Sequence, residues 1–288
     1  MLNRKKINGY IELTKPRILT LVLVTTTLGY YLGGKGMKSY LELFFLLLGA
    51  GLVCAGSATL NHYLEREFDS KMLRTKKRPI PSGLISAAHA LNYGIILTLA
   101  GLFILYVKTN TLTAFLSLLT SFLYIMVYTP MKRVSWLNTT VGAVPGAIPP
   151  LGGWACATGT LNFDAGILFL ILFVWQHPHF YAIAWMFKDD YERGGFKMLP
   201  TADPTGLKLF SQIKFYAFLL IPISIIPFFT GISGAIYLVG SFFLGLALLM
   251  TSLRFTTSHS MVDARNLLRA TVIYLPVLLT LIIIDVNF

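Results

Sequence analysis

Charged residues are scarce in this sequence. Asp, Glu, Lys and Arg make up 12% of its 288 residues, whereas hydrophobic residues make up 55%. This balance is typical of a membrane protein, and it leaves no soluble domain in the chain. The net charge of +12 therefore does not indicate a nucleic-acid-binding protein, because there is no soluble domain to carry such a surface.

Cysteine is nearly absent, and the N-terminal residues do not predict a cleavable signal sequence. Cys54 and Cys156 both lie in apolar runs, which excludes a disulfide framework and a cysteine-based metal site. Three cations at residues 4–6 resemble the start of a signal peptide. However, Thr14–Arg17 follows them, and no small-x-small cleavage site ends the apolar run. We therefore expect the first apolar run to be retained as a transmembrane helix.

Nine apolar runs are long enough to cross a membrane, which takes about 20 apolar residues. They cover residues 18–34, 40–60, 90–107, 111–129, 138–157, 165–187, 210–230, 234–253 and 267–285. The sequence thus predicts an all-α polytopic membrane protein of nine transmembrane helices, with residues 1–288 forming a single domain.

Positive charge is distributed unevenly between the two sides of this predicted topology. Of the 24 Lys and Arg residues, only Lys35, Lys38 and Lys108 fall in loops on the side opposite the N-terminus. Because loops facing the cytoplasm carry an excess of Lys and Arg, the pattern predicts a cytoplasmic N-terminus and an external C-terminus.

Two long loops on the predicted inner side, residues 61–89 and 186–209, carry acidic residues. Each follows an even-numbered span, and each runs from acids to Lys and Arg and then to Pro and Gly. The offset of four helices between them suggests internal duplication. We therefore expect the two loops to converge on one site.

The first acidic loop places oxygen-bearing side chains at regular spacing. Asn61, Glu65 and Asp69 are four residues apart, so on a helix they stay within about 80° of one another. An oxygen-rich stripe suits Mg²⁺, which is commonly held by a few carboxylates and substrate phosphates. The cations that follow suit a polyanion: Lys71, Arg74, Lys76, Lys77 and Arg78. A solvated loop with ordinary inner-side charge also fits this spacing.

These parts together fit one kind of substrate. A diphosphate would be held by metal and cations at the membrane surface, and its hydrocarbon tail would extend into the helical bundle. Metal ions and cations stabilise the charge that develops on a diphosphate leaving group.

Longer motifs carry a family resemblance along nearly the whole chain. They are ELTKPRI (12–18), RTKKRPIPSG (74–83), YTPMKR (128–133), GAVPGAIPPLGGW (142–154), WQHPHFYAIAW (175–185), KDDYERGGFKMLP (188–200) and YLP (274–276). The chain resembles the UbiA superfamily of intramembrane prenyltransferases. WQHPHF followed by DDY and MLP is similar to the branch that prenylates haem. The resemblance implies helices around a central cavity, and transfer of farnesyl from farnesyl diphosphate to a vinyl group of protohaem IX, giving haem O.

The resemblance also implies roles for individual residues. Mg²⁺ would be held by Asn61, Glu65, Asp69, Asp189 and Asp190. The cations facing the diphosphate would be Arg74, Arg78, Lys132 and Arg133. Asn61, Asp69 and these four cations are the expected catalytic residues, together with His179. Glu65 stands where the family usually has Asp. Met186 stands where the wider superfamily has an Asp that the haem branch also lacks.

Two histidines flank Pro178 near the inner end of the sixth span. A haem acceptor is consistent with axial ligation of its iron by imidazole, or with proton handling at its vinyl group. We expect His179 and His177 to contact the haem, although packing at a proline-distorted helix is the other interpretation.

Lys15 and Arg17 fit a simple helix boundary around Pro16, and the resemblance also allows a role at the mouth of the site.

Three other functions remain open at this level. An aromatic acceptor, as in quinone biosynthesis, would keep the mechanism, whereas a transporter usually carries ionisable groups near the middle of the membrane. A purely structural subunit leaves the two acidic loops without a role.

Expected partners are farnesyl diphosphate, protohaem IX and membrane lipid, with haem A synthase or a cytochrome oxidase assembly factor as a further partner. The expected location is a plasma membrane rather than the mitochondrial inner membrane.

Overall fold

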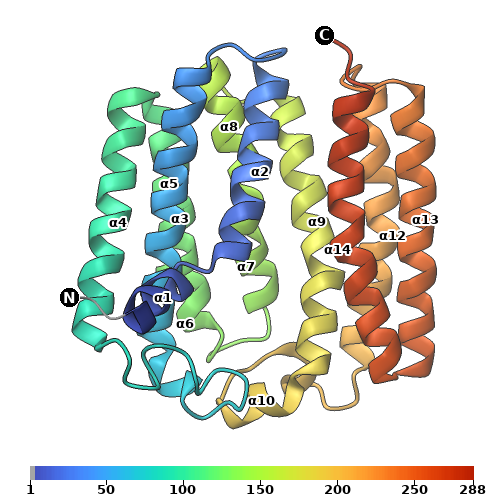
Figure 1. The fold of residues 1–288 in the computed structure, drawn as a ribbon. Coiled ribbons are helices and arrows are strands. Elements are labelled where there is room, and N and C mark those ends of the chain that lie inside the picture. Colours follow the sequence, from blue (N-terminus) through green and yellow to red (C-terminus); the bar gives the residue numbers. More distant parts are fainter. Residues whose placement is uncertain (1–3) are drawn as a thin grey trace.

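The structure is a computed structural model that describes residues 4–288, and its regular elements are helices (Figure 1). The first half contains α1 (Arg4–Leu13), α2 (Pro16–Gly33), α3 (Tyr40–Asp69), α4 (Ala87–Lys108), α5 (Thr111–Phe122), the π-helix η1 (Leu123–Tyr128) and α6 (Thr129–Met131). The second half contains α7 (Asn138–Ala147), α8 (Pro149–Thr158), α9 (Phe163–Met186), α10 (Lys188–Arg193), α11 (Leu199–Ala202), α12 (Leu207–Phe229), α13 (Ala235–Ser258) and α14 (Met261–Ile284). The predicted all-α class is confirmed.

Seven helical segments within the described residues are long and apolar enough to cross a membrane. They are α3, α4, α5 continued through η1 and α6, α9, α12, α13 and α14. The first predicted run forms α2, an 18-residue helix that also contains Arg17 and several threonines. The fifth forms two short helices. The predicted count of nine spans is therefore not confirmed.

Proline divides the fifth apolar run. α7 ends at Ala147 and α8 begins at Pro149, with Ile148 between them. Proline has no N–H and its ring clashes with the preceding turn, so the Pro149–Pro150 pair ends one helix and begins the next. The break places the α7–α8 junction beside a cavity, where Pro145, Ile148 and Pro149 form part of the wall.

Polar caps define where several long helices begin. Ser39, Ser86, Asn110, Asn162 and Ser260 each accept a hydrogen bond from the backbone N–H three residues later. Such caps satisfy amide groups that have no partner within the helix. The helix starts are therefore encoded locally.

Glycines allow two helix pairs to pack closely. A Cβ at Gly29 in α2 would lie 2.0 Å from the carbonyl oxygen of Pro150, and one at Gly153 in α8 would lie 1.9 Å from that of Thr26. Gly56 in α3 approaches α4 in the same manner. Small residues let backbones approach closely where helices pack in a membrane.

The two acidic loops and α1 lie at the same end of the bundle, at the bottom of Figure 1, and the C-terminus lies at the other end. This relative placement agrees with the predicted topology. Large apolar side chains point outward, among them Phe103 and Phe243, as expected of a surface that faces lipid. The predicted domain also includes residues 1–3, which lie outside the described residues.

We predict that Gly29→Ala lowers the stability of the purified protein in detergent by about 1–3 kcal/mol, because overpacking separates α2 from α8. Thermal unfolding measures the change. Gly166→Ala is the matched control, since a Cβ there meets nothing within 4 Å. Equal melting temperatures for the two variants would contradict the close α2–α8 contact.

Candidate functional site

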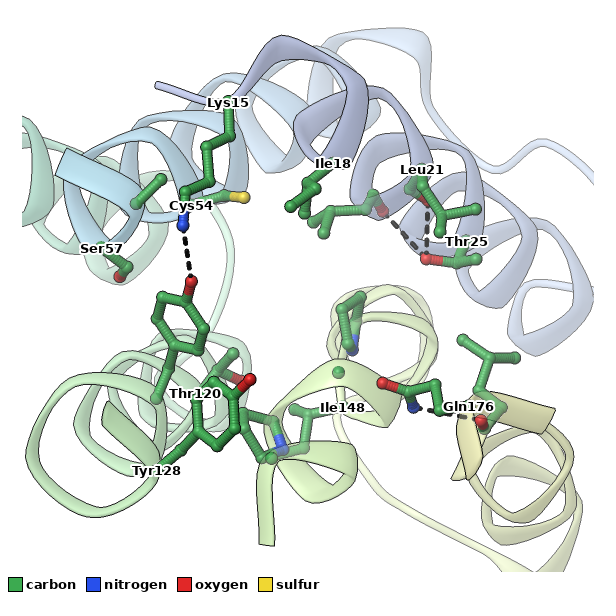
Figure 2. Close-up of a pocket in the computed structure, with 18 of the residues that line it drawn as sticks. Lys15, Ile18, Leu21, Thr25, Cys54, Ser57, Thr120, Tyr128, Ile148 and Gln176 are labelled. Atoms are coloured by element: carbon green, nitrogen blue, oxygen red, sulfur yellow. Dashed lines mark hydrogen bonds between the residues drawn. The ribbon is translucent and has the colours of Figure 1, made fainter. Parts of the chain in front are cut away.

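A cavity of about 520 Å³ lies inside the bundle, and the cations of its lining, Lys15, Arg74 and Lys132, lie in or beside the acidic segment 61–89. Residues of α2, α3, α5, η1, α7, α8, α9 and α10 line it, joined by a few from the loops. Within residues 4–288, α12, α13 and α14 contribute none of the lining. In Figure 2, Lys15 extends past Cys54 toward a tyrosine hydroxyl, while Gln176 and Ile148 lie on a different wall.

The predicted oxygen stripe is buried at the end of α3. Asn61 and Asp69 have no exposed surface, and Glu65 is 5% exposed. Buried polar and charged groups are costly unless they are paired. The three side chains therefore need partners, which other parts of the chain supply.

Each of the three accepts a hydrogen bond from a different cation. Lys15 Nζ donates to Asn61 Oδ1 (2.6 Å), Lys132 Nζ donates to Glu65 Oε1 (2.7 Å), and Arg78 Nη1 lies 2.7 and 2.8 Å from the two oxygens of Asp69. Two of the four predicted cations, Lys132 and Arg78, thus contact the stripe directly. The third cation is Lys15, for which sequence analysis left open a helix boundary or a role at the mouth of the site.

Sequence analysis left Lys15 between a helix boundary and a role at the mouth of the site, and the structure places its ammonium beside Asn61 in the cavity lining. The backbone of Lys15 adopts the left-handed conformation (φ 51°, ψ 65°), which is uncommon for a residue other than glycine. Its ammonium also lies 3.1 Å from the hydroxyl of Tyr124 and lines the cavity. The sequence offered two signals: a lysine directly before a helix-starting proline, which an ordinary helix boundary also gives, and the ELTKPRI motif of the family resemblance.

The two lysines differ in their electrostatics. Burial, reinforced by the charge of Arg78, lowers the pKa of Lys15 to about 7. Burial also acts to lower the pKa of Lys132, but the Glu65 carboxylate, together with Tyr128 and Tyr124, outweighs it and raises that pKa above its ordinary value. Lys132 is thus a fixed positive charge beside the cavity.

The second acidic loop meets the first through Asp190. Its carboxylate accepts hydrogen bonds from the backbone N–H groups of Leu73 (2.9 Å) and Arg74 (3.3 Å), and it also pairs with Arg193. Burial alone would raise the pKa of Asp190, but these donors lower it. Asp189 is exposed. Asp190 therefore joins the two loops.

The other two predicted cations lie on aromatic faces. Arg74 lines the cavity, lies 4.4 Å from the ring centre of Phe187 and donates to the hydroxyl of Tyr191 (3.3 Å). Arg133 is exposed, lies 4.9 Å from the ring centre of Phe68 and does not line the cavity. Arg74 is thus the better placed of the two to reach a ligand.

A π-helical turn places two tyrosines beside the stripe. Tyr124 and Tyr128 in η1 stack with ring centres 5.6 Å apart, and both line the cavity. Thr129 closes the turn by donating to the Tyr124 carbonyl (2.8 Å), and its hydroxyl accepts from Asn61 Nδ2 (3.0 Å). π-turns are frequent at functional sites. The pattern of apolar residues predicted an ordinary helix here.

The two predicted histidines lie in different surroundings. His179 lines the cavity. His177 has no exposed surface and does not line the cavity. Its two ring nitrogens lie 2.8 Å from the Phe173 carbonyl and 3.3 Å from the Thr140 hydroxyl, so both are occupied within the protein. His177 also stacks on Tyr216 at 3.6 Å. The geometry of His177 is that of a packed core residue.

The donor set decides what kind of metal site could form here. Within the described residues 4–288, no three His, Cys, Asp or Glu side chains come together so that they could hold a metal ion. The oxygens of Asn61, Glu65 and Asp69 still suit Mg²⁺, which often takes one or two carboxylates and completes its shell with substrate phosphates and water. The site therefore fits a Mg²⁺ that arrives with a phosphate-bearing ligand, rather than one held by protein alone.

Comparison with known proteins gives a consistent family assignment. The family model for the UbiA prenyltransferase family matches residues 22–273. A protohaem IX farnesyltransferase of Solibacter usitatus is 45% identical over 96% of this chain and 98% of its own. The one from Aquifex aeolicus is 38% identical over 97% and 95%, and the mitochondrial one of Arabidopsis thaliana is 39% identical over 94% and 63%.

Solved structures share the fold at low sequence identity. A structure of digeranylgeranylglyceryl phosphate synthase aligns with a TM-score of 0.81 at 18% identity, covering 97% of this chain and 98% of that one. A UbiA homologue from Archaeoglobus fulgidus bound to GPP and Mg²⁺ aligns with a TM-score of 0.68 at 14% identity, covering 95% and 99%. These likenesses concern the arrangement of helices.

We predict that Lys132→Met destabilises the protein by about 3–5 kcal/mol, because it leaves Glu65 charged and buried without its partner. The double variant Glu65→Gln/Lys132→Met should recover most of that loss. Denaturant unfolding in detergent measures both. Arg66→Met is the control. It breaks an exposed pair with Glu67 and should cost about 1 kcal/mol or less. A double variant no more stable than Lys132→Met would show that the pair is not the cause.

Proposed function

The chain belongs to the UbiA prenyltransferase family, and we propose that it transfers a farnesyl group from farnesyl diphosphate to a vinyl group of protohaem IX, giving haem O and diphosphate. The observation that carries this proposal is a cavity with cations at one end and apolar walls beyond them. The names of the relatives supply the acceptor and the donor.

The polar end of the cavity binds the diphosphate. Lys15, Lys132 and Arg74 line it, and Arg78 lies beside it on Asp69. Cations placed where negative charge develops stabilise a leaving group more strongly in an enclosed site than in water. We assign the predicted diphosphate-facing role to these four residues, with Arg133 outside the lining.

Mg²⁺ supplies further neutralisation of the leaving diphosphate when it is bound. Glu65 and Asp69 are the carboxylates this chain offers to it, with Asn61 as a neutral oxygen donor. In the structure, Lys15, Lys132 and Arg78 bond the oxygens of these three side chains. The same cations are therefore placed to bond the phosphates instead when the diphosphate and Mg²⁺ bind. Asp190 supports this arrangement by fixing the loop that carries Arg74 and Arg78.

The apolar part of the cavity holds the farnesyl chain. Leu46, Val53 and Leu116 line it, as do Ile18 and Leu21 of α2. These walls exclude water from the reacting carbon until the acceptor is in place. The stacked rings of Tyr124 and Tyr128 lie next to the cationic end, where their faces can stabilise positive charge on the allylic carbon.

The reaction balances with water as the third reactant. The bond between C1 of the farnesyl group and the diphosphate oxygen breaks, and the electron pair leaves with the diphosphate. C1 then bonds the terminal carbon of the vinyl group. Water adds to the inner vinyl carbon and releases a proton, so the haem gains one farnesyl group and one hydroxyl.

We also propose how the protein lies in the membrane. The acidic loops and α1 share one end of the bundle, and the bias of Lys and Arg places that end in the cytoplasm. The bacterial relatives favour a plasma membrane. Association with haem A synthase or an oxidase assembly factor stays a prediction.

The proposal is tested with purified protein, protohaem IX, farnesyl diphosphate and Mg²⁺, followed by mass analysis of the extracted pigment. We expect haem that has gained one farnesyl group and one water, and no such product in EDTA. A prenylated phenol or naphthol, formed when those acceptors are offered and with haem left unchanged, would keep the diphosphate site and replace the acceptor.

We predict that Asp69→Ala lowers turnover about 100-fold or more, because a group that organises charge at the leaving diphosphate is lost. Glu67→Ala is the control, since Glu67 lies two residues away on the exposed face of α3 and should keep turnover near that of the unmodified protein. Thermal unfolding confirms that both variants fold. Near-normal turnover of Asp69→Ala would remove this carboxylate from the site.

A further inference from the structure

A hydrogen bond to α14 fixes the protonation of the His179 ring. His179 Nδ1 lies 2.9 Å from Thr271 Oγ1, and that hydroxyl donates its only proton to the Leu268 carbonyl (2.7 Å). Oγ1 can therefore only accept from the ring, so Nδ1 carries the hydrogen. In the neutral ring, Nε2 is then left with a free lone pair.

The orientation of the ring is fixed as well. His179 stacks on Trp175, one helical turn earlier, with ring centres 5.1 Å apart and planes 23° from parallel. Trp175 Nε1 in turn donates to the backbone carbonyl of Thr271 (2.8 Å). Thr271 thus holds Trp175 by its carbonyl and His179 by its hydroxyl.

His179 lines the cavity, whereas Thr271 stands behind the wall. The His179 side chain keeps some exposed surface and is part of the lining, while Thr271 is fully buried. No hydrogen bond to His179 Nε2 is found within residues 4–288. The ring is therefore anchored at Nδ1, with Nε2 open for a ligand.

We infer that Thr271 is a positioning residue that sets His179 to bind the iron of the haem substrate through Nε2. The inference rests on the proposed function, because it requires haem as the acceptor. Histidines that ligate metals usually donate their other ring N–H to an oxygen, which fixes the tautomer and strengthens the ligand. An iron–nitrogen bond then holds the porphyrin in one place relative to the farnesyl carbon, and such positioning lowers the barrier between two reactants.

Ligation by iron can be separated from simple packing by changing the metal. The full-length protein in detergent is titrated with protohaem IX, with zinc protoporphyrin IX, which takes one axial ligand, and with metal-free protoporphyrin IX. We expect the unmodified protein to prefer the two metal porphyrins by about 10-fold or more. In His179→Ala that preference should disappear while affinity for the metal-free porphyrin is kept, and added imidazole should restore an imidazole-ligated haem spectrum.

Thr271 is tested by a matched pair of substitutions. Thr271→Val keeps the shape and loses the hydroxyl, so affinity for the metal porphyrins should fall about 10-fold or more and the haem absorption spectrum should change. Thr271→Ser keeps the hydroxyl and should restore both. A variant that lost only packing would bind all three porphyrins more weakly by the same factor. His89→Ala, which removes an exposed histidine in the first turn of α4, controls for binding of haem at the surface.

The outcomes separate this inference from the function on which it rests. If haem is farnesylated but His179→Ala and Thr271→Val keep the preference for metal porphyrins, the iron ligand lies elsewhere and the inference is wrong. If no porphyrin binds the unmodified protein and haem is not farnesylated, the acceptor proposed above is wrong and the inference falls with it. Loss of the metal preference in both variants, with recovery in Thr271→Ser, supports it.

Discussion

The site is arranged around three buried oxygen-bearing side chains at one end of α3, because each of them must have a hydrogen-bond partner. Asn61, Glu65 and Asp69 have almost no exposed surface, and in that setting each needs a partner. Lys15 reaches them from the start of α2, Lys132 from the end of α6, and Arg78 from the loop after α3. The pairing therefore ties three parts of the chain to one helix end.

Under the proposed function, the same pairing prepares the site for an anionic ligand. Cations held on carboxylates and an amide are already concentrated and oriented, so less ordering remains when a diphosphate enters. In the same proposal, a Mg²⁺ arriving with the ligand would be held by Glu65 and Asp69, and would offset the charge of their carboxylates in place of the cations. Without the ligand, the cations and the stripe oxygens neutralise one another. With it, the same cations are free to pair with the phosphates, so one arrangement of charges serves both states.

The far side of the cavity depends on a different kind of support. α9 supplies the wall, and α14, which does not reach the cavity, holds that wall through Thr271. Trp175 and His179 are one turn apart on α9, so one residue of α14 orients both rings. The C-terminal helices thus act on the site through contacts rather than through lining residues.

Sequence alone determined what depends on local pattern. Hydropathy gave the all-α membrane class, helical spacing put Asn61, Glu65 and Asp69 on one stripe, and the motifs gave the family. Caps such as Ser39 and Asn162 are local as well, because each bonds an amide only three residues away.

Tertiary structure decided the pairings and the side chains that face the cavity. Lys15 and Asn61 are 46 positions apart and His179 and Thr271 are 92 apart, and helical periodicity carries no information about contacts at such separations. The same holds for Asp190, which bonds the backbone of the other acidic loop, and for His177, which turns into the core although it lies two residues from His179. The π-turn at Leu123–Tyr128 belongs here too, because neighbouring helices satisfy the backbone groups that such an irregularity leaves free. The break at Ile148, in contrast, follows from the local Pro149–Pro150 pair.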